Sequence, residues 1–96
     1  MLTATIPPAV ARLCGDELCV RVPQLRYAVG HRQREAALEH AHALRGMAAN
    51  FGLSGLALAL GVLERTAKEG TAPLDHAFAA VEREVMPALN ALGYAA

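Results

Sequence analysis

The chain has 96 residues, of which 54% are hydrophobic, and its nine Lys and Arg balance nine Asp and Glu for a formal net charge of zero. This length allows one domain, and the balanced charge argues against a nucleic-acid binder, which usually carries a basic excess. The longest apolar stretch, at residues 56–63, is too short to cross a bilayer, so we expect no direct membrane insertion.

The N-terminal third predicts two helical pieces. Residues 1–8 are expected to form a loose lead-in, followed by a short helix over residues 9–13 that Gly15 ends. Asp16 is placed to cap a second, longer helix whose apolar residues recur at helical spacing. Pro23 lies inside that segment, where it should kink or divide the helix.

Three further segments carry amphipathic helical patterns. Residues 32–50 place Ala and Leu side chains along one side at steps of three and four, and Gly52 suits the left-handed turn that follows. The pattern restarts over residues 53–70 and again over residues 74–92. In the last segment the apolar register continues on both sides of Pro87, which should bend that helix without ending it.

Together these patterns predict an all-α fold, namely an antiparallel up-down four-helix bundle with a short additional N-terminal helix. We expect a single domain over residues 1–96, with the core bundle covering about residues 16–92. The apolar stripes have the width that one bundle can bury, which favours a monomer over a helical dimerisation domain.

The most distinctive segment is Ala41-His42-Ala43-Leu44-Arg45-Gly46. His42 projects away from the centre of the apolar stripe, and Arg45 and Gly46 follow it at i+3 and i+4. Glycine inside a helix costs roughly 1 kcal/mol relative to alanine, which indicates that another molecule approaches the helix closely here. The segment resembles the histidine-containing phosphotransfer (HPt) domains of two-component phosphorelays, whose signature is His-x-Leu-Lys-Gly, preceded by Ala and followed later by Gly.

The resemblance implies a phosphorelay intermediate. His42 would accept a phosphoryl group from an aspartate of a receiver domain and pass it to another receiver domain. Arg45 would stabilise the phosphate charge in place of the family's usual Lys. Glu64 lies 22 positions after His42, where the family often has a Gln or Glu that hydrogen-bonds the other ring nitrogen. Without the resemblance, Glu64 is more simply interpreted as a solvated position on its helix.

The resemblance also implies the partners. Gly46, Ala49, Asn50 and Tyr27 would form the rim on which a receiver domain docks, either that of a response regulator or that of a hybrid sensor kinase. The Mg²⁺ needed for transfer would belong to the receiver, so we expect no cofactor on this chain. It is expected to be a phosphohistidine carrier and not a kinase, because no glycine-rich phosphate loop precedes a helix.

Two alternatives and the location follow from the remaining features. A module of the same fold that docks a receiver or kinase without being phosphorylated stays open as the main alternative. A metal or haem bundle would need inward Glu-x-x-His pairs, and the spacing of Cys14 and Cys19 fits no zinc or redox motif, so we expect no metal site. Because the N-terminus lacks the pattern of a secretory signal, we expect a cytoplasmic protein or the cytoplasmic end of a membrane-bound sensor kinase.

Overall fold

The computed structural model describes residues 6–70 and 72–94, and in that part of the chain all regular secondary structure is helical. The four helices are α1 (Pro8–Gly30), α2 (Arg34–Asn50), α3 (Ser54–Glu69) and α4 (Asp75–Ala91). This confirms the predicted all-α class. The lead-in predicted over residues 1–8 lies mostly outside the described residues.

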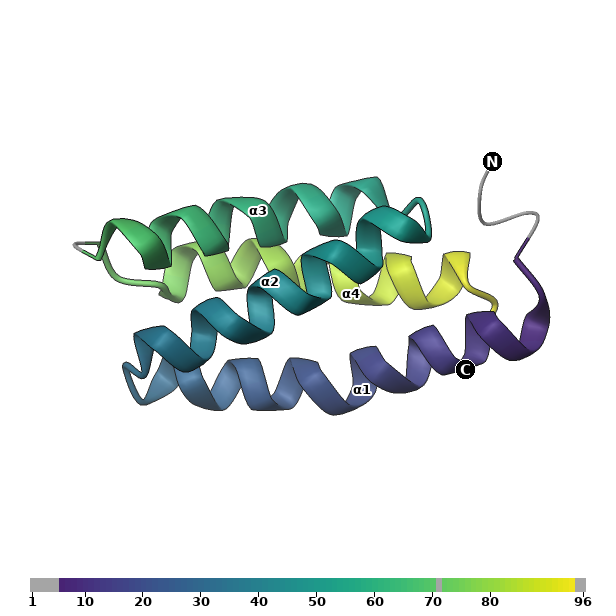
Figure 1. Cartoon of the computed structure of the whole chain (residues 1–96), viewed down its shortest axis with the longest axis horizontal. Helices are drawn as coiled ribbons and strands as arrows, with labels where there is room; N and C mark the ends of the chain where they lie inside the picture. The colour runs from purple at the N-terminus through teal and green to yellow at the C-terminus, as the bar shows by residue number, and fades with distance from the viewer. Residues whose placement is uncertain (1–5, 71, 95–96) are drawn as a thin grey trace.

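The helices lie side by side along a body of 40 × 20 × 18 Å. The chain reverses its direction along the long axis at each of the three short connections (Figure 1). Contacts between α1 and α2, α2 and α3, α3 and α4, and α1 and α4 close the four helices into a bundle. Helix α2 therefore packs against both α1 and α3, and α2 and α3 lie next to each other in the bundle.

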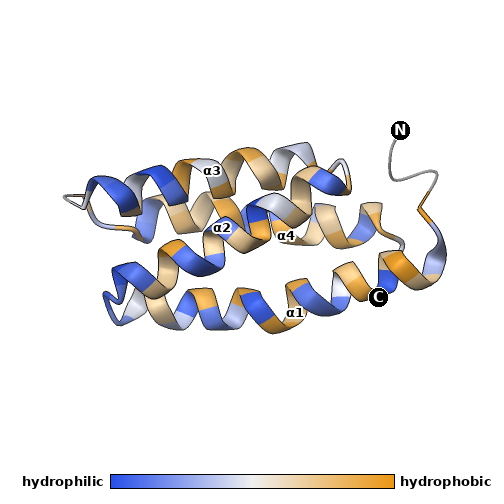
Figure 2. Ribbon diagram, viewed as in Figure 1, coloured by the Kyte–Doolittle hydropathy of each residue, from blue (hydrophilic) through white to orange (hydrophobic). Residues whose placement is uncertain are grey.

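The core is built from the apolar stripe of each helix. Orange and blue segments alternate along the ribbons in Figure 2, as amphipathic helices require. The largest fully buried side chains are aliphatic and come from all four helices: Leu18, Leu25, Leu44, Leu56, Leu60, Leu63 and Val81. Burial of these side chains supplies the main driving force for folding and fixes which side of each helix faces solvent.

The first helix differs from its prediction. The separate short helix over residues 9–13 is wrong, because α1 continues without interruption through Gly15. Gly15 has a packing role instead: a Cβ at this position would overlap the ring of Tyr94, so the absence of a side chain lets that ring lie against the helix. Asp16 does not cap a helix; its Oδ1 accepts a hydrogen bond of 2.6 Å from the Tyr94 hydroxyl.

Both internal prolines are accommodated within continuous helices. Pro23 lies inside α1 and does not divide it, and Pro87 lies inside α4, which continues to Ala91 as predicted. Proline removes one backbone donor from each helix. Val22 and Leu25 are buried beside Pro23, and Ala88 is buried beside Pro87, so packing against the core holds each helix together across the lost hydrogen bond.

Helix α2 ends in the left-handed conformation predicted at Gly52, where φ is 72°. The Leu53 amide donates to the Ala48 carbonyl at 2.9 Å and the Gly52 amide to the Ala49 carbonyl at 3.2 Å. This pair of bonds is the Schellman arrangement, which satisfies the last free carbonyls of a helix. Arg32 holds the equivalent position after α1 with φ of 57°, although it carries a side chain.

The conformation of Arg32 leads to a stability prediction. The left-handed region costs a residue with a Cβ about 1–2 kcal/mol. Glycine adopts this region without that strain, but it loses more conformational entropy on folding. We therefore expect Arg32→Gly to be about 0.5–1 kcal/mol more stable than the matched variant Arg32→Ala, in which the side chain is removed and the strain kept. Urea unfolding of both variants measures the difference; equal midpoints would contradict it.

Candidate functional site

His42 lies midway along α2 with its imidazole directed away from the core. Ala41, Leu44 and Ala48 on the same helix are buried, while the His42 side chain is 67% exposed. The spacing of the apolar residues in α2 fixes this orientation, because a helix that buries these positions must turn the position after Ala41 outward. The imidazole is therefore accessible to a partner.

Glu64 on α3 lies directly across from this imidazole. It is the one buried charged residue in the described part of the chain, with 6% of its surface exposed. Its Oε2 lies 2.7 Å from Nδ1 of His42, and its Oε1 accepts a hydrogen bond of 2.6 Å from Nε–H of Arg45. The interpretation of Glu64 as a solvated position is wrong, because packing of α2 against α3 covers the carboxylate and places it between the two side chains.

The electrostatics keep this carboxylate ionised. The hydrogen bond from Arg45 is the main cause that lowers the pKa of Glu64 below its ordinary value of 4.5, and the hydrogen bond with His42 acts in the same direction against the opposing effect of burial. An ionised carboxylate only accepts hydrogen bonds, so Nδ1 of His42 carries the hydrogen. In the neutral ring this tautomer leaves the lone pair on Nε2.

Lys68 is a cation of this site that the sequence analysis missed. Its Nζ lies 4.0 Å from Oε2 of Glu64, one helical turn away on α3. A surface hollow of about 740 Å³ is lined by Glu64 and Lys68 of α3 and by Glu35, Glu39 and His42 of α2. The spacing of four residues between Glu64 and Lys68 was visible in the sequence, but it becomes informative only once Glu64 is known to face His42.

The predicted docking residues are only partly brought together. Gly46, Ala49 and Asn50 are exposed on α2, and a Cβ built on Gly46 would have no neighbour within 4 Å. Tyr27 on α1 lies elsewhere: it lines a separate hollow, into which His42 does not extend. Its ring stacks on that of His31, with centroids 3.8 Å apart.

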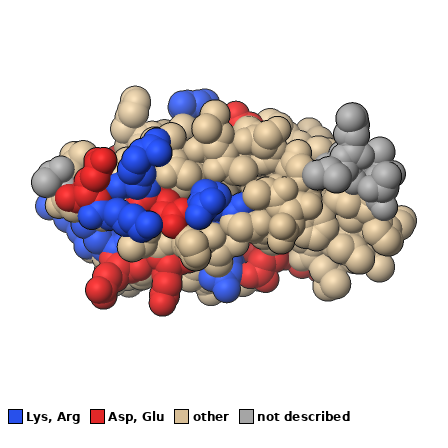
Figure 3. Space-filling model, turned by 45° about the horizontal axis from the view of Figure 1, so that its top comes forward, with Lys and Arg blue, Asp and Glu red and all other residues tan. Residues whose placement is uncertain are grey.

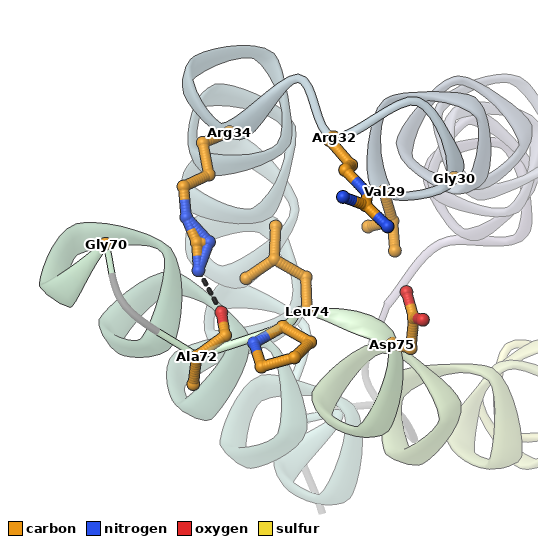
Figure 4. Close-up of a pocket in the computed structure, with 9 residues that line it drawn as sticks. Val29, Gly30, Arg32, Arg34, Gly70, Ala72, Leu74 and Asp75 are labelled. Atoms are coloured by element: carbon orange, nitrogen blue, oxygen red, sulfur yellow. Dashed lines mark hydrogen bonds between the residues drawn. The ribbon is translucent and has the colours of Figure 1, made fainter.

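A further cavity, of about 510 Å³, lies at the end of the bundle between the α1–α2 and α3–α4 connections. Figure 4 shows Arg34 directed at the carbonyl oxygen of Ala72, to which it donates a hydrogen bond, while Arg32 extends towards Asp75. None of the predicted site residues lines this cavity. Because the side chains that line this cavity hold the two connections together, we assign the cavity a structural role.

The described residues contain neither a cluster of metal-ligating side chains nor a membrane-spanning helix. Among them, no three His, Cys, Asp or Glu side chains are grouped so that they could hold a metal ion. None of the helices in this part of the chain combines the length and apolar character needed to cross a membrane.

A family model described as the Hpt domain matches residues 9–92, a span that contains His42, Arg45 and Glu64. No curated protein and no solved structure matches the sequence.

Proposed function

The chain belongs to the Hpt domain family, and we propose on that premise that His42 is its phosphorylated residue. Hpt domains carry phosphoryl groups on histidine in phosphorelays, are not kinases, and interact with receiver domains and kinases. For this chain we propose the specific route from a receiver-domain aspartate to His42 and on to another receiver domain. The observation that carries the proposal is the exposed imidazole whose Nδ1 is bonded to the buried Glu64 carboxylate at 2.7 Å.

The proposed step is an in-line displacement at phosphorus. Nε2 of His42 forms a bond to phosphorus as the bond to the aspartate oxygen breaks, and the aspartate leaves with that electron pair as a carboxylate. The ring becomes cationic, and the Glu64 carboxylate at Nδ1–H stabilises the positive charge. The transfer to a second receiver runs through the same geometry in reverse.

Charge stabilisation of the phosphoryl group is assigned to Arg45, with Lys68 as a second cation. Arg45 commits Nε–H to Glu64, which leaves the donors on its two Nη atoms for phosphoryl oxygens. Glu64 thus positions the nucleophile with one oxygen and the cation with the other. The Mg²⁺ that assists the transfer is proposed to sit on the receiver domain, and no cofactor on this chain takes part.

The proposal is tested by phosphotransfer from a receiver domain carrying radiolabelled aspartyl phosphate to the purified chain. The expected product is an acid-labile, base-stable label that peptide mapping places on His42, since a phosphoramidate has this stability. Receiver binding with no label from any of several receivers would overturn the proposal in favour of a docking module that is not phosphorylated.

Gly46 gives a second test, which separates docking from folding. An added side chain at Gly46 meets no other atom of the free protein, and leucine forms helix better than glycine by roughly 0.5–1 kcal/mol. We therefore expect Gly46→Leu to unfold at higher urea concentration and yet to lose transfer, because the new side chain occupies the surface beside His42. Normal transfer by this variant would show that no partner approaches the helix closely at Gly46.

A further inference from the structure

Charge is distributed unevenly around His42. Residues 46–63, which run from the last turn of α2 through most of α3, contain no Asp, Glu, Lys or Arg. In Figure 3 charged side chains gather towards one end of the visible face, and a large part of the remaining surface is uncharged. His42 and Arg45 immediately precede the uncharged segment in the sequence, and Glu64 immediately follows it, so the site lies at its boundary.

Leu58 is the most exposed large apolar residue of the described chain, at 73%. It lies on α3, three positions before Gly61, and residues at this spacing share a helix face. A Cβ at Gly61 would be 3.5 Å from Cδ of Arg45, so this face of α3 adjoins the Arg45 side chain. Leu58 therefore projects from the same α2–α3 surface as the site, on its uncharged side.

The opposite side of His42 is acidic. Glu35 and Glu39 precede His42 by seven and three positions, are exposed, and line the hollow beside the imidazole together with Lys68, the one cation in its lining. An aspartyl phosphate and the carboxylates around it are anionic. A donor covering Glu35 and Glu39 would therefore place like charges together, which is unfavourable at an interface from which water is excluded.

We propose, as an extension of the phosphotransfer role assigned to His42, that the receiver domain covers the uncharged side of the site with an apolar surface and that Leu58 is its main apolar contact. Its anionic phosphoryl end faces His42, Arg45 and Lys68. The donor phosphorus must come within about 3–3.5 Å of Nε2, so a docked receiver necessarily covers surface within a helical turn or two of His42. Continuity with the site identifies the occupant as the receiver.

The test compares Leu58→Ser with Met86→Ser. Met86 is a matched control: it is also apolar and 61% exposed, but it lies on α4, which packs against α3 and α1. Receiver binding, followed by titration without phosphorylation, is expected to weaken about ten-fold or more for Leu58→Ser and to stay within about two-fold for Met86→Ser. Equal affinities for the two variants would overturn the proposal.

Two further outcomes bear on the proposal. The variant carrying both Glu35→Gln and Glu39→Gln is expected to bind the receiver at least as tightly as the original chain; weaker binding would place the receiver on the acidic side and overturn it. If sedimentation detects a dimer of the original chain and Leu58→Ser dissociates that dimer, the surface binds a second copy of the chain, and the proposal is overturned. Since titration needs no phosphate transfer, loss of binding by Leu58→Ser supports the surface even if the original chain takes no label on His42.

Discussion

Replacing His42 with glutamine is expected to abolish phosphorylation of the chain while leaving its stability within about 0.5 kcal/mol of the original. The glutamine amide nitrogen is not a nucleophile, so no phosphoramidate can form. The same amide is able to donate a hydrogen bond to Glu64, and the His42 side chain is largely solvent-exposed, so little packing is lost. Label incorporated from a phosphorylated receiver measures the first effect, and the urea midpoint measures the second.

The matched control is His40→Gln on the same helix. His40 is half-buried and its Nδ1 lies 3.2 Å from Nη1 of Arg21, so it faces α1 and not α3. This variant is expected to accept label at the normal rate. Label on His42→Gln together with its loss from His40→Gln would move the phosphorylated residue to the other histidine and refute the proposed role of His42.

Much of the fold could be predicted because the apolar spacing of each helix is set by the side it buries. Leu44, Leu60 and Val81 recur at the predicted positions and are fully buried. The prediction of a separate short helix over residues 9–13 is wrong for a non-local reason: glycine is a common helix end, but Gly15 lies inside α1, and the ring of Tyr94, 79 positions later, packs where a side chain would be. A prediction from neighbouring residues cannot include such a long-range contact. The turn at Gly52 was predictable because it depends only on the residues next to it.

The candidate site was predictable to a smaller extent. The sequence placed His42 outside the apolar stripe, but burial of Glu64 depends on how α2 and α3 pack, which periodicity does not reveal. Leu58 lies two positions from the buried Leu56 and Leu60, so helical spacing turns it away from their side. Only the structure shows how far it is exposed to solvent, because that depends on which elements pack around α3.

The second large effect is expected from Arg45→Met, which removes the guanidinium and keeps much of the aliphatic chain. Oε1 of Glu64 then loses its hydrogen-bond donor while the carboxylate remains buried. A buried acceptor left without a partner costs about 1–3 kcal/mol, so the free energy of unfolding should fall by about that amount near pH 7. The matched control is Arg65→Met on α3, an exposed residue, which should change stability by less than about 0.5 kcal/mol.

The pH dependence identifies the cause of that loss. Because the pKa of Glu64 is lowered in the folded protein, its contribution to stability is present above its ordinary value of 4.5 and is lost as pH falls through the lower folded value. Arg45→Met removes the largest cause of the lowered pKa of Glu64. The difference in free energy of unfolding between this variant and the original chain should therefore be largest near neutral pH and should become smaller below about pH 4.5. Urea unfolding at about pH 7 and about pH 3 measures this. A difference in the free energy of unfolding that is the same at both pH values would mean that Arg45 stabilises the bundle independently of the ionised Glu64 carboxylate, and would contradict this explanation.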